Sequence, residues 1–254
     1  MEHEDADGQR LLAMNPEQLY REGRLTEAIS AAASLLRDDP ANERLRTFLV
    51  ELLCFAGDYE RADKHLELLG GKTRDRQMGA LHLRAAMRTA TTREEMFEKN
   101  EVPPPPASAP VRGKLNGTPF ESLTDADPRI GARVEVFAAG NYMMIPMNGI
   151  SVLSIHEPRR ARDLLWAPSV VNMSSTIGGG MELGDVLLPA IAAMSCSHSD
   201  DLVKLGRVSV WESDGANEYV FGQKLLLVDG EEFPLLEVRS LEIHAEESSG
   251  HGST

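Results

Sequence analysis

The chain has 254 residues, of which 42% are hydrophobic and 26% are charged, values that are ordinary for a soluble protein with one large or two medium domains. Its formal net charge is −14, and residues 101–254 carry most of the excess, with 21 acidic and 11 basic side chains. Such an acidic surface repels phosphate backbones, which excludes nucleic acid as an expected partner.

The first ten residues, MEHEDADGQR, are acidic and polar, which is the opposite of a secretory signal peptide. No apolar run approaches the roughly 20 residues that a membrane-spanning helix needs. The two cysteines, Cys54 and Cys196, lack the spacing of a zinc site, and reduced thiols are the simplest interpretation. We therefore expect a cytoplasmic protein without a membrane partner, and we expect residues 1–10 to be disordered.

Residues 11–99 have the periodicity of amphipathic helices, because apolar side chains recur every three or four positions. Asn15 followed by Pro16 is typical of the first turn of a helix, and Pro40 after two aspartates is typical of a break between helices. A further helix is predicted over residues 75–90, DRQMGALHLRAAMRTA. This part of the chain is therefore predicted to be a helical domain.

Two stretches of the helical part repeat one pattern at an interval of 34 residues, EGRLTEAI at residues 22–29 and AGDYERAD at residues 56–63. The interval is that of tetratricopeptide repeats, in which each unit is a pair of antiparallel helices. The glycine permits a tight turn, the bulky residue two positions later anchors the second helix, and the alanine allows close packing. The residues assigned to the repeat are Gly23, Ala28, Pro40, Gly57, Tyr59 and Ala62.

The repeat pattern supports two units and a degenerate third, in which Thr91 stands at the place of the glycine and Met96 at that of the alanine. Two units seldom bury enough surface to be stable alone, because each contacts only its neighbours. We therefore expect flanking helices or the rest of the chain to complete the stack. Helical hairpins with coincident spacing are the alternative interpretation.

Residues 100–112 include the run NEVPPPPASAP. Four consecutive prolines cannot continue a helix and favour a stiff, extended segment. We interpret this segment as a linker between two domains, and a proline-rich ligand for another module is the alternative.

Residues 113–244 alternate short β-prone runs with turn signals. Asp229 and Gly230 between two apolar runs predict a β-hairpin. The stretch HEPRRARDLLWAPS, residues 156–169, is the one place where a short helical turn is predicted. The whole chain is thus predicted to be α+β, with a tetratricopeptide-like domain before a β-rich domain with short helices, and residues 245–254 are predicted to be a disordered tail.

Two stretches invite a catalytic interpretation without supporting one. The glycine-rich run at residues 175–185 has neither the GK[ST] ending nor the GxGxxG spacing of a phosphate-binding loop. Cys196 and His198 lie in one short loop, where a nucleophile and its base are seldom adjacent. We interpret both stretches as loops and expect no enzyme activity, no cofactor and no metal; a hydrolase or ligand site near Cys196 is the remaining enzymatic alternative.

A group of polar and aromatic residues in the second half is of the types that dominate protein interfaces. The same residues could instead hold an irregular β-rich domain together, and the sequence leaves both roles open. The candidates for partner binding or domain anchoring are Arg162, Asp163, Trp166, Arg207, Trp211 and Gln223.

The tetratricopeptide-like pair followed by DPRIGARVEVFAAGNYMMIPM, ARDLLWAPSV, LLPA, LGRVSVW and GQKLLLVDGEEFPLLEVRSLEI resembles the ImpE family, also called TagJ or SciE. The resemblance spans residues 11–243. The chain departs from the family at Phe120 and Leu123, where tryptophans are usual, and at Met143 and Met144, where an aromatic residue is usual.

The resemblance implies a non-enzymatic accessory protein of a bacterial type VI secretion system. It implies binding to the N-terminal helix of the small contractile-sheath subunit, and a connection to the AAA+ ATPase that recycles contracted sheath. Helical repeats form grooves that accept a helix by its apolar face, and the acidic second domain could steer a basic partner. A general scaffold or chaperone for another secretion component or effector is the alternative.

Overall fold

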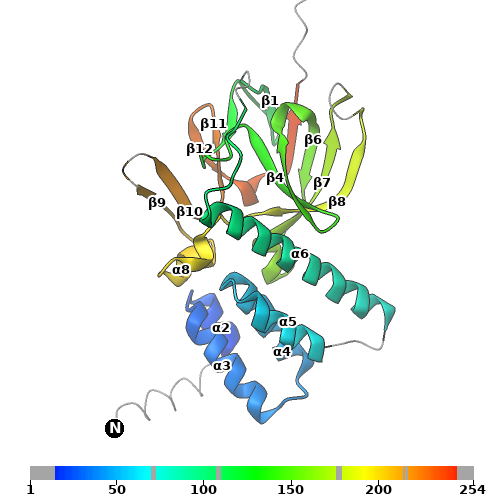
Figure 1. Cartoon of the computed structure of the whole chain (residues 1–254), viewed down its shortest axis with the longest axis vertical. Coiled ribbons are helices and arrows are strands. Elements are labelled where there is room, and N and C mark those ends of the chain that lie inside the picture. Colours follow the sequence, from blue (N-terminus) through cyan, green and yellow to red (C-terminus); the bar gives the residue numbers. More distant parts are fainter. Residues whose placement is uncertain are drawn as a thin grey trace, which may run out of the picture.

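A computed structural model of the chain describes residues 15–69, 73–106, 110–175, 179–213, 215 and 217–244. A helical part is followed by a part built from antiparallel strands and short helices (Figure 1). The predicted α+β fold class is therefore confirmed. The segments expected to be disordered, 1–10 and 245–254, lie outside the described residues.

The first described helix begins where the sequence predicts a helix start. The Asn15 side chain accepts a hydrogen bond from the Glu17 backbone N–H at 2.9 Å, and Pro16 occupies the first helical position. Asn42 and Asp58 cap two later helices in the same way. The helices described in this part are α2 (Pro16–Arg21), α3 (Leu25–Asp38), α4 (Glu43–Phe55), α5 (Tyr59–Leu68) and α6 (Arg74–Glu98).

Helices α2 and α3 form the first repeat unit, and α4 and α5 form the second. Their apolar faces meet in one core, in which Leu19, Leu49 and Phe55 are almost completely buried. Ala28 and Ala62 are fully buried between helices, and Pro40 lies in the break between α3 and α4.

The degenerate third window does not form a hairpin, because α6 runs for 25 residues without a turn. The helix is longer than the predicted residues 75–90. No glycine is present to reverse the chain at Thr91, and the Thr91 hydroxyl donates to the Met87 carbonyl within the helix at 3.1 Å. A single long helix therefore follows the second repeat.

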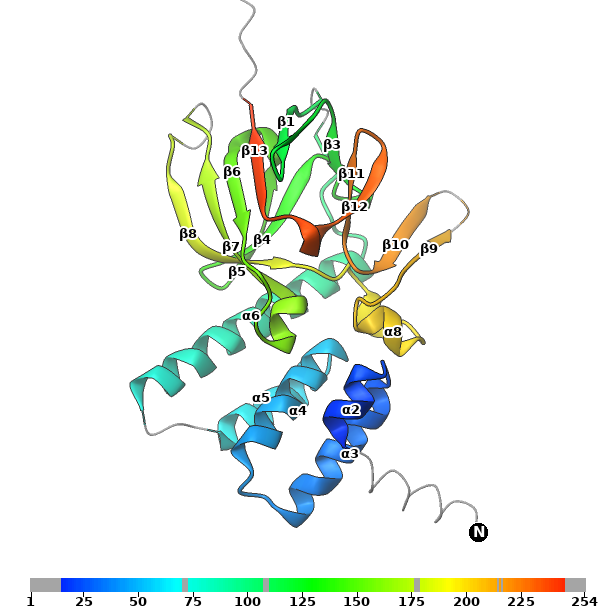
Figure 2. The same cartoon turned by 180° about the vertical axis from the view of Figure 1, so that it is seen from behind.

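The strands form three antiparallel sheets (Figures 1 and 2). The largest has the order β2 (Thr118–Phe120), β1 (Gly113–Leu115), β13 (Ser240–Ile243), β6 (Ile150–Ile155), β7 (Trp166–Met173), β8 (Glu182–Pro189), β4 (Arg133–Ala138) and β5 (Asn141–Pro146). The second has the order β12 (Glu231–Pro234), β11 (Leu225–Val228) and β3 (Leu123–Asp125), and the third pairs β10 (Glu218–Gly222) with β9 (Ser209–Ser213). The first two sheets pack on one hydrophobic core.

Short helices occupy several of the connections. The predicted helical turn is a 3₁₀-helix, η2, and the hairpin predicted at Asp229 and Gly230 joins β11 to β12 through two residues with positive φ. Both predictions are confirmed. The short helices are η1 (Met147–Gly149), η2 (Ala161–Leu164), η3 (Ser195–Ser197), α8 (Asp201–Lys204) and η4 (Leu235–Glu237).

The proline-rich segment is described from residue 101 to 106, where it is extended and lies against the β-rich part. The Arg133 guanidinium donates to the Pro103 carbonyl at 2.8 Å. A Cβ atom at Gly131 would lie 2.9 Å from the Pro105 Cβ atom. This stretch thus follows the surface of the β-rich part on its way from α6 to β1.

The two parts of the chain share a hydrophobic core. The cluster formed by the repeat helices also contains side chains of the β-rich part, namely Phe137, Leu165, Trp166, Ile191 and Leu205. The two-unit stack is therefore partly covered on one side by α6, and on the other side it packs against the β-rich part.

Candidate functional site

An open groove with a volume of about 390 Å³ runs between α4, α5 and the first half of α6. It is lined by Glu43, Arg44, Thr47, Val50, Glu51, Leu66, Leu69, Arg76, Gly79, Ala80, Leu83 and Arg162. All but Arg162 come from the helical part, and Arg162 reaches the groove from η2.

The groove exists because α6 covers the second repeat only partly. The exposed first turns of α6, residues 74–79, give way to buried positions from Leu83 onward. In a longer repeat array the next unit would cover α4 and α5. In this chain a single helix, α6, stands in the place of that next unit, so the groove remains open along the second repeat.

The groove has an apolar floor and a charged rim. Val50 and Leu66 are buried beneath it, and Leu83 forms the base of the α6 wall. At the mouth, the Arg76 Nη1 atom lies 2.9 Å from the Glu43 Oε2 atom. This is the combination that binds an amphipathic helix, with apolar anchors in the floor and charges along both sides.

Partial burial and nearby charges act on Glu51 at the edge of the groove. Burial raises the pKa of its carboxyl group, and the positive charges of Arg162 and Arg160 oppose that rise. At this rim, the carboxylate of Glu51 in α4 is thus attracted by two arginines of the β-rich part.

Gly79 leaves room in the groove wall. It lies inside α6, where glycine weakens a helix, and a Cβ atom added there would meet no atom within 4 Å. The gap allows the backbone of a bound chain to approach α6 closely.

The structure separates the roles of Arg162 and Asp163. The Asp163 Oδ2 atom accepts hydrogen bonds from the backbone N–H groups of Arg159 and Arg160, at 2.9 and 3.0 Å. Asp163 therefore stabilises the turn that carries η2, while Arg162 lines the groove.

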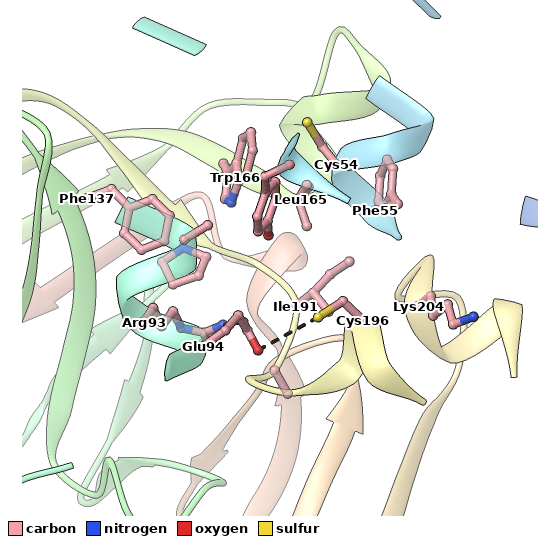
Figure 3. Close-up of a pocket in the computed structure, with 14 residues that line it drawn as sticks. Cys54, Phe55, Arg93, Glu94, Phe137, Leu165, Trp166, Ile191, Cys196 and Lys204 are labelled. Carbon is pink, nitrogen blue, oxygen red and sulfur yellow. Dashed lines mark hydrogen bonds and ion pairs between the residues drawn. The ribbon is translucent and has the colours of Figure 1, made fainter. Parts of the chain in front are cut away.

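Trp166 lies at the junction of the two parts and not on the surface. It is 4% exposed, and its ring centroid is 6.3 Å from that of Tyr59 in the second repeat. Figure 3 shows it beside Leu165 and near Cys54 and Phe55 of α4. Trp166 therefore anchors the β-rich part to the repeats.

Arg207 and α8 hold the first repeat. The Arg207 guanidinium donates to the carbonyl oxygens of Tyr20 and Arg21, both at 2.5 Å, at the end of α2. Asp201 accepts hydrogen bonds from the backbone and hydroxyl of Thr26 at 2.7 and 3.0 Å. The turns at Gly23 and Gly57, where φ is +84° and +70°, both lie against this part of the β-rich region.

The loop that contains Cys196 and His198 belongs to the same junction. The Cys196 thiol lies 3.9 Å from a Glu94 oxygen, as Figure 3 shows, and burial raises the pKa of that thiol to about 11. The His198 Nε2 atom instead lies 3.2 Å from Glu212. Within the described residues, no group of three His, Cys, Asp or Glu side chains could hold a metal ion. Gly178 of the glycine-rich run lies outside these residues.

Trp211 and Gln223 are not part of the groove. Trp211 lies in β9, and Gln223 directly follows β10. Trp211 is 40% exposed, and its indole N–H donates to Glu232 of β12 at 2.9 Å. Gln223 forms an isolated bridge with Ile191, and its carbonyl accepts from the Ser209 hydroxyl at 3.1 Å. Neither residue contributes to the groove.

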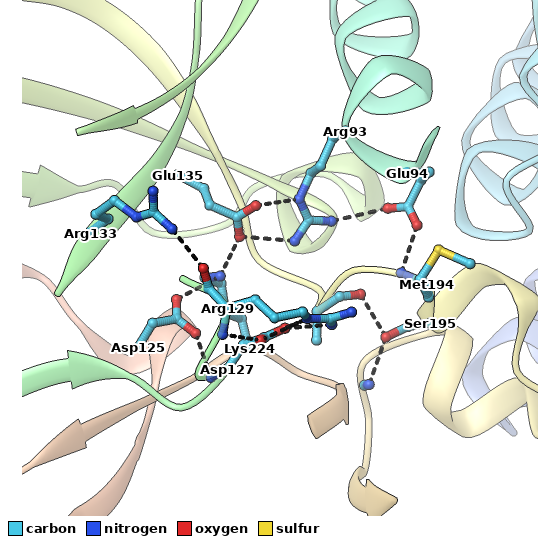
Figure 4. A network of polar contacts seen from close by, with 12 residues as sticks. Arg93, Glu94, Asp125, Asp127, Arg129, Arg133, Glu135, Met194, Ser195 and Lys224 are labelled. Carbon is cyan, nitrogen blue, oxygen red and sulfur yellow. Dashed lines mark hydrogen bonds and ion pairs between the residues drawn. The ribbon is translucent and has the colours of Figure 1, made fainter. Parts of the chain in front are cut away.

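A buried network of charges fixes α6 on the sheet (Figure 4). Arg93 of α6 donates to both oxygens of Glu135 of β4, at 2.6 and 2.9 Å. Lys224 pairs with Glu135 and lies 2.7 Å from Asp125. Burial alone would raise the pKa of Glu135, but Arg93 and Lys224 hold that pKa well below its usual range. The second half of α6 is thus anchored, while its first half forms the groove wall.

Sequence reasoning missed both the groove and this network. The charged residues of the network are far apart in the sequence, and no sequence motif or regular spacing indicates that they pair. The groove had one available signal, a glycine at position 79 inside a predicted helix that continues the repeats.

Comparison with known proteins agrees with this architecture. A family model described as "Tetratricopeptide repeat" matches residues 19–85, which confirms the interpretation of the 34-residue interval. A model described as "ImpE protein" matches residues 117–242. The "Type VI secretion system accessory component TagJ" of Pseudomonas aeruginosa is 30% identical over 91% of this chain and 92% of its own length. The chain belongs to the ImpE family.

The fold of this ImpE-family chain is similar to the crystal structure of protein VPA1032 from Vibrio parahaemolyticus, with a TM-score of 0.78. That similarity covers 91% of this chain and 98% of the other at 23% identity. Among the departures from the family pattern, Phe120 and Leu123 are buried core residues, whereas Met143 is 40% exposed on β5. No described helix is long and apolar enough to cross a membrane.

Proposed function

We propose that this ImpE-family chain is a non-enzymatic accessory protein of a bacterial type VI secretion system. Its groove binds the N-terminal helix of the small contractile-sheath subunit. The proposal is supported by the similarity to TagJ, whose name gives it an accessory role in such a system, and by the groove itself.

The observation that carries the proposal is the uncovered side of the second repeat. A helix is about 10 Å wide with its side chains, and an incoming helix in this groove would take the place of the missing third unit. Its apolar face would cover the partly exposed Leu69 and Ala80, above a floor of buried Val50, Leu66 and Leu83. The repeats of this chain and the bound helix would then form one continuous stack.

The rim selects the charges of the bound helix. Arg44 and Arg76 line the rim together with Glu43 and Glu51, and charged side chains of the bound helix would exchange with the internal pairs Arg76–Glu43 and Arg44–Glu17. Because both signs occur, the helix should carry mixed charges beside an apolar stripe at positions i, i+3, i+4 and i+7. A few buried apolar anchors should supply most of the affinity.

Binding in this mechanism is non-covalent and shields the sheath helix from other contacts. The chain presents that subunit to the AAA+ ATPase that recycles contracted sheath, as the family resemblance implies. No step requires a bond to be made or broken, so no catalytic group is invoked.

Calorimetric titration of the full chain with a peptide of the sheath subunit's N-terminal helix tests this function. Gly79→Leu fills the groove wall without a clash in the free protein and favours the helix, so the variant should fold well. We expect it to weaken binding about tenfold or more. Thr92→Leu, at an exposed position in the other half of α6, is the matched control and should bind like the wild type.

Absence of binding by the wild type at high micromolar peptide would reject the function. Equal binding by Gly79→Leu and the wild type would place the helix elsewhere on the chain. Titration with a peptide from a secreted effector tests the scaffold alternative, which would be favoured if only that peptide bound.

A further inference from the structure

The β9–β10 hairpin has a free strand edge. β9 is paired with β10 and with no other described strand. In both views β9 is the outer strand of the hairpin, on the side away from the eight-stranded sheet (Figures 1 and 2). An unpaired edge presents backbone N–H and C=O groups that can accept a strand from another chain.

The side chains on this hairpin do not protect the edge in the usual way. Natural edge strands are commonly protected by lysine, proline or a bulge. Here Trp211 is 40% exposed and Val208 is 36% exposed. Because the Trp211 indole donates to Glu232, its ring is held between β9 and β12, and β12 is itself the edge of the three-stranded sheet. A fixed, partly exposed tryptophan is a typical anchor for a binding partner.

Acidic side chains outnumber basic ones around Trp211, although Arg129, which is paired with Asp127, lies over the Tyr219 ring of β10. Residues 208–237 contain seven acidic side chains and one basic side chain, Lys224. Lys224 is buried and pairs with Asp125 and Glu135, so its charge does not reach the surface. Within the described part of the chain, no lysine or arginine forms an ion pair with Glu232, whereas Glu212 lies 3.2 Å from the His198 Nε2 atom. The complementary partner is therefore basic.

We propose that the edge of β9 binds an extended, lysine- or arginine-bearing segment of a partner protein by strand addition. The backbone of that segment pairs with β9, and one of its cationic side chains lies over the Trp211 ring. Cations two positions away in that segment lie on the same face and pair with Glu232, which the Trp211 indole contacts. This surface is separate from the groove, and it takes a strand where the groove takes a helix.

A nine-residue peptide of alternating lysine and threonine is the probe. Trp166 is only 4% exposed, so acrylamide quenching of the full chain reports mainly Trp211. We expect the peptide to protect Trp211 from acrylamide, and we expect calorimetry to show binding that Trp211→Ser weakens about tenfold or more. Because Trp211 is exposed, this variant should fold normally.

Two comparisons separate strand addition from general attraction to an acidic protein. Replacing every threonine of the peptide by proline keeps the charge and removes backbone donors, so its binding should be at least about tenfold weaker. Glu232→Gln, which keeps an acceptor for the Trp211 indole, should weaken binding of the threonine peptide more than Glu182→Gln, at an exposed position on β8. Equal binding of the two peptides, unchanged binding by Trp211→Ser, or equal effects of the two glutamate substitutions would each overturn the proposal.

Discussion

Gly23 of the first repeat lies directly against Leu202 of α8, so closely that a Cβ atom at residue 23 would lie 2.3 Å from the Leu202 Cδ2 atom. Gly57 has the equivalent place in the second repeat, and a Cβ atom there would lie 3.0 Å from the Cys196 Cβ and Sγ atoms. Both glycines therefore close a helical turn and allow the β-rich part to approach it. The 34-residue interval of the repeat is also the interval between two contacts of the junction.

Gly23→Ala should destabilise the protein for two separable reasons. The left-handed backbone conformation costs a non-glycine residue roughly 1–2 kcal/mol, and displacement of the Leu202 side chain adds about 1 kcal/mol. Gly117→Ala is the matched control, because φ is +85° there and a Cβ atom would meet nothing within 4 Å. Urea unfolding should show a larger loss for Gly23→Ala than for Gly117→Ala. Equal losses in the free energy of unfolding would mean that the contact with Leu202 does not contribute to the effect of Gly23→Ala.

Both thiols should react slowly in the folded protein. Cys54 is 1% exposed, and burial raises its pKa well above the usual range. The pKa of about 11 for Cys196 leaves roughly one thiol in ten thousand ionised at pH 7, and the thiolate is the reactive form. We expect labelling by Ellman's reagent to be about a hundredfold slower in the native chain than in urea. Rapid labelling of native Cys196 would instead show that its thiol is reactive, which would support a nucleophilic role for this cysteine.

The sequence was sufficient to predict features that depend on neighbouring residues. The start of α2 at Asn15 and Pro16, the hairpin at Asp229 and Gly230, and the helical turn η2 each follow from local backbone preferences. The repeats were predictable because one spacing occurs twice. These features need no knowledge of the tertiary fold.

The missed features depend on residues that only folding brings together. Arg93 and Glu135 are 42 positions apart and carry no pattern that pairs them. Arg162 was a candidate because of its neighbours Asp163 and Trp166, yet in the structure each of the three has a different role: Arg162 lines the groove, Asp163 caps a turn and Trp166 is buried at the junction. Proximity along the chain was a poor guide there, because a 3₁₀ turn directs successive side chains to different surroundings.

Removal of Arg93 should be strongly destabilising. Arg93→Met leaves Glu135 buried with only Lys224 to balance its charge, and breaking a buried pair in this way typically costs about 3–5 kcal/mol. The double variant Arg93→Met with Glu135→Leu should lose less than the sum of the single losses, because no unpaired charge remains. Lys64→Met, in the exposed pair with Glu60, should leave the free energy of unfolding nearly unchanged. Additive losses in the double variant would show that Arg93 and Glu135 are not coupled.

Asp125 should make stability depend on pH in the direction opposite to most carboxylates. Its burial raises its pKa to about 6 despite the nearby Lys224, so between about pH 4 and 6 the folded chain retains a proton that the unfolded chain has released. The contribution of Asp125 to the free energy of unfolding therefore falls as pH rises through this range. Asp125→Asn removes the titration, and relative to this variant the wild type should lose about 1 kcal/mol between pH 5 and pH 7. Urea unfolding at several pH values measures the difference. Parallel curves for Asp125→Asn and the wild type would mean that Asp125 stays ionised in the folded chain throughout, held so by Lys224.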